Sequence, residues 1–205
     1  MGVVRKQMGK HDGAAASGTG GLRRRGELCD EQSIEEKAMP PMTALGWFHT
    51  AMGVLAIGTA VFTLRRHHFI SLASFSGRIY LLITLVVAGS ALMIYNQGGF
   101  GVGHMLAVLT LVALAVGALM ERRPLLGPFS IYLQTAAYSA TVLFHMVPAI
   151  TDFLRRLPVG DPFADSLDAP LVRGFHLTFL SLFALGLLWQ WRALKCRDSA
   201  DDGGF

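Results

Sequence analysis

The sequence predicts an all-α protein, an integral membrane bundle of five transmembrane helices with short loops. Two observations predict it. Of the 205 residues, 52% are hydrophobic and only 16% are charged, with a mean hydropathy of +0.45, whereas soluble domains carry about 25% charged residues. The apolar residues also fall into separate runs, each close to the roughly 20 helical residues that cross a hydrocarbon core about 30 Å thick.

The predicted spans cover residues 43–64, 78–95, 104–120, 129–153 and 174–191. Each is expected to be a helix, because a backbone inside lipid must bond its own N–H and C=O groups. None shows the alternation of apolar and polar residues that a transmembrane β-strand requires. We therefore expect one bundle over residues 42–194, followed by a C-terminal tail over 195–205.

Residues 1–41 form a different kind of segment, rich in glycine, alanine and serine and containing three consecutive arginines at 23–25. It has few large apolar residues to bury, which predicts a disordered N-terminal tail. An alternative is that native translation starts at Met39 or Met42, because the residues at 35–37 have purine-rich codons that resemble a ribosome-binding sequence. The first predicted span would then begin almost at the N-terminus.

Basic residues predict the orientation, because positive charges near span ends stay in the cytoplasm. Most basic residues flank one end of the spans, and the opposite turn "NQGGFGVG" has no charge. The N-terminus is therefore expected outside and the C-terminus in the cytoplasm, in the inner (plasma) membrane. The residues concerned are Arg65, Arg66, Arg78, Arg122, Arg123, Arg192, Lys195 and Arg197. Aromatic residues expected at the two interfaces are Trp47 and Tyr95 outside and Tyr80, Trp189 and Trp191 inside.

The fourth span carries a stripe of polar and special residues spaced three or four apart, which places them on one helix face. This face is expected to point inward, because polar groups at membrane depth face the bundle interior or a water-filled cavity. A proline within the stripe is expected to kink the helix beside a histidine. The stripe comprises Gln134, Tyr138, Thr141, His145, Pro148 and Asp152.

Four histidines on four different spans are predicted to lie within roughly 12 Å of the outer interface. One interpretation is that each makes a single interhelical hydrogen bond or caps a helix. The other is a shared site for b-type haem or a transition metal, with His145 paired to His49 as the metal ligands and two further cofactor-binding residues. The complete set is His49, His104, His145 and His176.

Two further features lie at the interfaces. His67 and His68 sit in a basic turn on the inner side, where contact with lipid headgroups is expected. In the loop after the fourth span, Asp161 followed by Pro162 predicts a short helix with Asp161 as its N-cap.

The order of features resembles a family of bacterial multi-pass membrane proteins of unknown function. The resemblance rests on "GWFHTAMGVLAIGT", a basic turn, "SGRIYLL", "GFGVGHMLAVLTLVALAVGALMER" and "YSATVLFHMVPAITDFLRRLPVG", and covers about residues 44–160. It implies the same architecture and a role for His49, His104 and His145, and it implies no activity.

Three functions remain open: a haem or metal protein, a small transporter or proton-conducting protein, and a non-catalytic membrane subunit. No phosphate-binding glycine loop, nucleophile elbow or HExxH motif identifies a reaction, so whether the chain is an enzyme stays open. The expected partners are membrane lipids, with a membrane protein or a second copy as further candidates. His49 shares its helix face with the small residues Gly46, Gly53, Ala56 and Ala60, a surface that lets transmembrane helices approach closely. Nucleic acid is excluded, because the basic pI of 9.4 comes largely from arginines that flank the spans.

Overall fold

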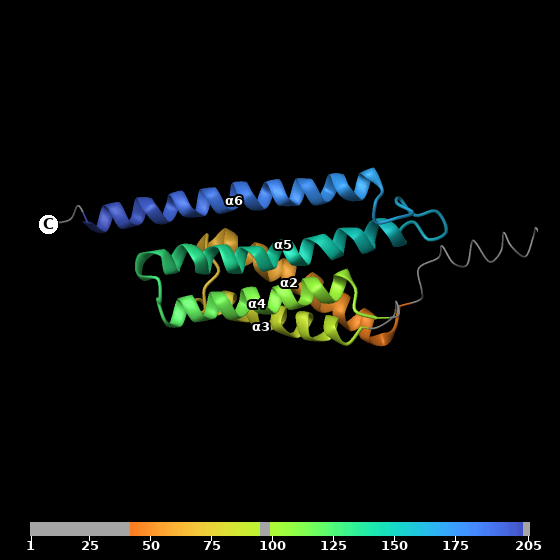
Figure 1. Cartoon of the computed structure of the whole chain (residues 1–205), viewed down its shortest axis with the longest axis horizontal. Coiled ribbons are helices and arrows are strands. Elements are labelled where there is room, and N and C mark those ends of the chain that lie inside the picture. Colours follow the sequence, from red (N-terminus) through yellow and green to blue (C-terminus); the bar gives the residue numbers. More distant parts are fainter. Residues whose placement is uncertain (1–41, 95–98, 203–205) are drawn as a thin grey trace, which may run out of the picture. The chain divides into compact units, whose positions relative to one another are not determined.

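The computed structural model describes residues 42–94 and 99–202, with side chains up to residue 196, and shows five long helices (Figure 1). All five are long and apolar enough to cross a membrane, which confirms the predicted all-α fold with five spans. A short 3-10 helix, η1 (Gly127–Phe129), precedes the fourth long helix. The long helices are α2 (Ala44–His67), α3 (Phe75–Leu92), α4 (Val102–Arg122), α5 (Ser130–Arg156) and α6 (Pro170–Asp202). The predicted disordered tail at 1–41 and Tyr95 lie outside the described residues.

The helices begin where local chemistry favours a start. The hydroxyl of Thr43 accepts the N–H of Gly46 at 3.1 Å, and the hydroxyl of Ser74 accepts the N–H of Gly77 at 3.1 Å. These N-caps satisfy backbone donors that have no partner within the first turn. At the other end, α2 stops at His68, which adopts a left-handed backbone with φ of 65°.

The last helix is longer than its predicted apolar run at both ends. It continues past residue 191 to Asp202, across the expected boundary between bundle and tail. The added segment contains no glycine or proline before Gly203, so nothing in its local sequence stops the helix. Helix α5 continues without a break through Pro148, the residue at which a kink was predicted.

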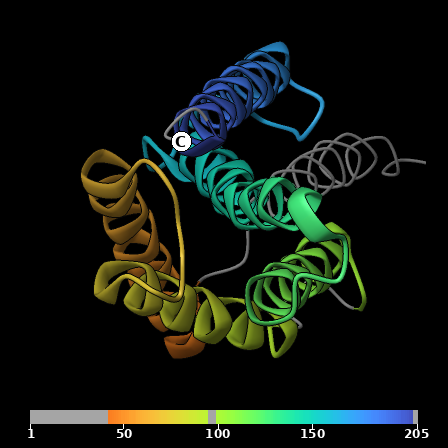
Figure 2. The same ribbon diagram turned by 90° about the vertical axis from the view of Figure 1, so that its left-hand side faces the viewer.

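Four helices, α2, α3, α4 and α5, form a ring in which each contacts its two neighbours, as the view along the helices shows (Figure 2). Helix α6 packs outside this ring, against α5. The main cluster of buried apolar residues lies within the ring and includes Ala56, Ala60, Tyr80 and Tyr138. The circumference is apolar, as expected of a surface that faces lipid, with Val54, Leu82 and Leu185 each more than half exposed.

Tyr80 does not lie at the membrane interface as predicted, because it is fully buried. Its ring packs in the cluster that contains the small residues Ala56 and Ala60, which leave space for it, and its hydroxyl finds a partner on α5. Trp47, Trp189 and Trp191 are exposed, in keeping with interfacial positions.

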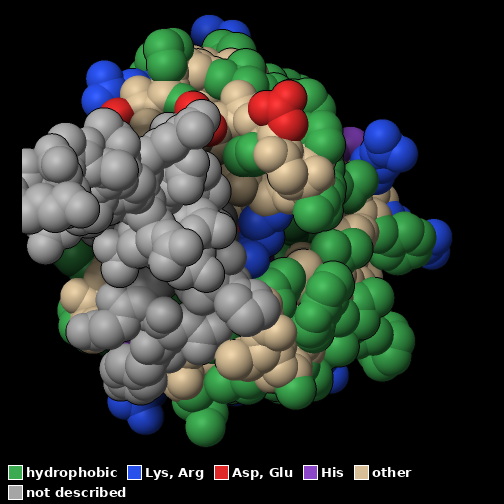
Figure 3. All heavy atoms as spheres, turned by 90° about the vertical axis from the view of Figure 1, so that its right-hand side faces the viewer, with side chains coloured by type: hydrophobic (Ala, Val, Ile, Leu, Met, Phe, Trp, Pro, Cys, Tyr) green, Lys and Arg blue, Asp and Glu red, His purple; other side chains and the backbone are tan. Residues whose placement is uncertain are grey.

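The short helix predicted after α5 is also absent, because this connection forms turns instead. The N–H of Asp161 donates to the carbonyl of Pro158, so Asp161 does not cap a helix. The next N–H groups, of Phe163 and Ala164, donate back to carbonyls at the end of α5 that would otherwise lack partners. Figure 3 views the bundle from this end and shows acidic and basic side chains among the surrounding hydrophobic ones.

Candidate functional site

The polar stripe of α5 has its middle inside the ring. Tyr138, Thr141 and His145 are 1%, 0% and 8% exposed, so the helical periodicity predicted their burial correctly. Gln134 and Asp152, at the two ends of the stripe, are only partly buried. Asp152 pairs with Arg156 on the next turn of the same helix at 3.0 Å.

The buried part of the stripe meets α3 through two side-chain contacts. The hydroxyl oxygens of Tyr80 and Thr141 are 2.6 Å apart, and the Nε2 atom of His145 lies 3.2 Å from the hydroxyl of Thr84. The rings of Tyr80 and His145 approach edge to face with centroids 6.4 Å apart. These contacts join α3 to α5 through two side-chain pairs one helical turn apart, His145 with Thr84 and Tyr80 with Thr141, and we call these four residues the interior row.

The direction of the hydrogen bonds in the interior row follows from the single hydrogen on each hydroxyl. Thr141 donates its hydrogen to the carbonyl of Tyr138 at 2.7 Å, so the Tyr80 hydroxyl donates to Thr141. The hydrogen bond from Tyr80 therefore leads through Thr141 to a backbone carbonyl.

His49 extends this polar interior toward the predicted outer face. Its Nδ1 atom lies 3.0 Å from the hydroxyl of Ser90, and Ser90 donates its own hydrogen to the carbonyl of Val87. The Nδ1–H of His49 is therefore the donor, and its Nε2 lone pair is free of this bond. His49 and His145 therefore both contact α3, at positions six residues apart.

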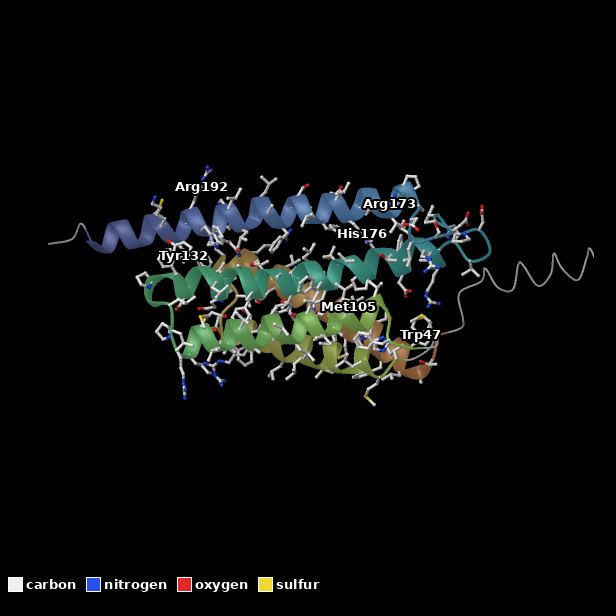
Figure 4. All side chains as sticks on the ribbon, in the orientation of Figure 1. Trp47, Met105, Tyr132, Arg173, His176 and Arg192 are labelled. Carbon is white, nitrogen blue, oxygen red and sulfur yellow. The ribbon has the colours of Figure 1, made fainter. Side chains whose placement is uncertain are left out.

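The other two predicted histidines are held elsewhere. His104 lies in the first turn of α4, where its Nδ1 atom accepts the N–H of Gly101 at 3.2 Å and its ring stacks on Phe100. His176 points from α6 toward α5 (Figure 4), and its Nε2 atom lies 2.8 Å from the hydroxyl of Thr151. Both contacts agree with the interpretation that each histidine caps a helix or joins two helices.

A metal centre receives no geometric support from the described part of the chain. It contains no group of three histidine, cysteine, aspartate or glutamate residues placed to hold a metal ion. A site between His49 and His145 alone, for haem or a metal, stays a prediction.

Sequence reasoning missed Glu121, which is the most connected side chain at the opposite end of the ring. Its carboxylate accepts the hydroxyl of Ser71 at 2.5 Å, the N–H groups of Leu72 and Ala73 at 3.0 and 3.3 Å, and the hydroxyl of Tyr138 at 3.0 Å. Glu121 thus joins α4 to the turn between α2 and α3 and to the polar stripe. Its only signal in the sequence is that it is the sole acidic residue between Glu36 and Asp152.

Gln190 was also missed, and it attaches α6 to the ring. It is 5% exposed, accepts the hydroxyl of Ser139 at 2.9 Å and donates its amide to the carbonyl of His68 at 3.0 Å. The ring of Trp189 packs edge to face on His68 with centroids 5.1 Å apart. The sequence signal for such a hydrogen-bonded contact between helices is a single polar residue among apolar neighbours.

The fold and this polar interior define an all-helical, multi-pass integral membrane protein. No family model, no curated protein and no solved structure matches the chain. The function is therefore argued from the geometry alone.

Proposed function

We propose that the protein is a small proton-conducting or proton-coupled transport protein, and that His145 carries the proton at membrane depth. The observation that supports this proposal is the interior row, in which a buried imidazole and three hydroxyl groups from α3 and α5 form two adjacent side-chain contacts. Ionisable residues at membrane depth are costly, and they commonly mark ion paths and proton relays.

The ionisable groups follow one another from the predicted outer face inward. Asp152 lies near the end of α5, His49 lies in the first turns of α2, and His145 lies two turns deeper in α5 than Asp152. A neutral imidazole carries one donor and one acceptor nitrogen, so it can take a proton on one side and release one on the other. His145 has this property, and its Nε2 atom lies in the interior row.

At Tyr138 the path is interrupted. The backbone carbonyl of Tyr138 ends the interior row, and its hydroxyl donates separately to Glu121. A carbonyl does not pass a proton onward, so this arrangement corresponds to a closed state of the proposed path. Opening requires water or a moved Tyr138 side chain between Thr141 and Glu121.

Proton flux into liposomes tests the proposal. Purified protein is reconstituted with a pH-sensitive dye inside, and a potassium gradient with valinomycin drives proton entry. We expect flux above that of protein-free liposomes, abolished by His145→Gln and unchanged by Ser181→Ala, because Ser181 is exposed on α6 and bonds only to its own helix backbone. Equal flux with and without protein, or an undiminished His145→Gln variant, would reject the proposal and favour the non-catalytic membrane subunit.

A haem or metal protein is the second candidate, with His49 and His145 as ligands. It is supported by the position of these two histidines on different helices of one ring, where one ring nitrogen of each contacts a hydroxyl of α3. Purification from haem-replete and metal-replete cells, followed by a visible spectrum and elemental analysis, separates this candidate from proton conduction. A Soret band lost in His145→Ala would support it, and a colourless, metal-free, folded protein would rule it out.

We further propose that the protein lies in the inner membrane with its C-terminus in the cytoplasm. The support is the positive-inside pattern, since Arg65, Arg66 and Arg78 flank the turn between α2 and α3 at the same end as Arg192. A reporter fused after Phe205 should be active only in the cytoplasm, and one inserted near Asp165 only outside. Reversed activities would overturn this orientation.

A further inference from the structure

We propose that the turn between α2 and α3 holds a binding site for the phosphate headgroup of an anionic phospholipid. The turn contains an open pocket of about 390 Å³, lined by His67, Phe69, Ser71, Ala73 and Ser74. The pocket lies where one candidate span ends and the next begins, which is the depth of lipid headgroups.

Three arginines flank this turn in the sequence, and one carboxylate, that of Glu121, is bound to it. Arg65 and Arg66 precede His67 in the last turn of α2, and both are exposed. Arg78 donates from Nε to the carbonyl of Leu72, which fixes its guanidinium beside the turn. Basic pockets between membrane helices attract anionic headgroups, and each arginine near the surface adds about 1 kcal/mol of attraction.

The apolar part of the pocket suits a lipid better than a free ion. Phe69 and Ala73 line it together with the two serines. Phe75, at the first position of α3, is 79% exposed and adds apolar surface beside the turn. A lipid can place its phosphate among the arginines and its acyl chains along this surface.

Several donors of the turn are already used within the protein. The N–H groups of Leu72 and Ala73 already donate to Glu121, and Ser71 donates its hydroxyl to the same carboxylate. Binding is therefore expected to depend on the arginines.

Ligand-dependent melting tests the site. Purified protein in a neutral detergent is titrated with dihexanoyl phosphatidylglycerol, with dihexanoyl phosphatidylcholine or with inorganic phosphate, and lipid adducts are counted by native mass spectrometry. We expect only the anionic lipid to raise the melting temperature. The double variant Arg65→Gln, Arg66→Gln should bind it about 30-fold more weakly, from two charges at about 1 kcal/mol each.

Two further variants make the test specific. Ala73→Phe fills the pocket without changing charge and should also abolish the shift. The matched control Arg192→Gln, Lys195→Gln removes two charges from the same end of the bundle, on α6, and Figure 4 shows Arg192 pointing away from the ring; it should bind as the wild type does. Equal stabilisation by phosphatidylcholine, an equal loss in the control, or full binding by Ala73→Phe would overturn the site. Equal stabilisation by inorganic phosphate would show an anion site and overturn the lipid assignment.

Discussion

Replacing Gly117 by alanine tests how tightly Tyr138 is held in the ring. A Cβ atom at Gly117 would lie 2.3, 2.6 and 2.9 Å from three ring atoms of Tyr138. Carbon atoms pack at about 3.5 to 4.0 Å, so the ring must shift by about 1 Å or more. Such a shift also lengthens the hydrogen bond of 3.0 Å between the Tyr138 hydroxyl and Glu121.

The expected cost combines these two effects. Overpacking costs about 1 to 3 kcal/mol. A hydrogen bond to a charged group contributes about 1.5 to 3 kcal/mol, and the longer bond loses part of this contribution. We therefore expect Gly117→Ala to lower the free energy of unfolding by about 2 to 4 kcal/mol, measured by reversible denaturation in mixed detergent micelles.

Gly53→Ala is the matched control, because a Cβ atom there meets nothing within 4 Å. This variant should be neutral or more stable by up to about 1 kcal/mol, since alanine favours a helix over glycine. A second variant, Gly117→Ala with Tyr138→Leu, removes the ring and should recover part of the loss. If Gly117→Ala is as stable as Gly53→Ala, the close packing of Tyr138 on α4 is refuted.

The remaining predictions concern polar contacts. Glu121→Gln should cost about 2 to 3 kcal/mol in detergent unfolding, because the amide presents donors to groups that are themselves donors; an unchanged unfolding curve would contradict the role of the carboxylate. Thr141→Val should cost about 1 to 2 kcal/mol because it leaves the Tyr80 hydroxyl without its partner on α5, whereas Ser181→Ala should cost less than about 0.5 kcal/mol. Gln190→Leu should speed proteolytic cleavage of the α5–α6 connection. A cleavage rate equal to that of the wild-type protein would contradict the role of Gln190 in holding α6 against the ring.

The sequence alone predicted the spans and the inward face of α5, because both depend on local properties. Apolar length identifies a span, and the spacing from Tyr138 to His145 identifies a helix face. The same reasoning placed four histidines near one side of the membrane. It could not determine which residue each histidine contacts, because that depends on how neighbouring helices rotate about their axes.

The residues that were misjudged or missed show the same limit. Tyr80 near the start of an apolar run resembles an interfacial aromatic, and only the space beside Ala56 and Ala60 brings it inside. Glu121 beside two arginines resembles an ordinary interfacial charge, yet it bonds to a turn about 50 residues earlier in the chain. Asp161 followed by Pro162 has the local chemistry of a helix start, but backbone bonds to the end of α5 hold this segment in turns.

Solid-state NMR of the ¹⁵N-labelled imidazole of His145, in lipid bilayers over a range of pH, tests whether this residue carries a proton within the membrane. We expect a neutral ring at high pH, and a charged ring with both nitrogens protonated as the pH falls while the protein stays folded. The assignment is checked by the loss of these signals in His145→Gln. A His145 ring that remains neutral at every pH at which the protein is folded would contradict the claim that it carries a proton within the membrane.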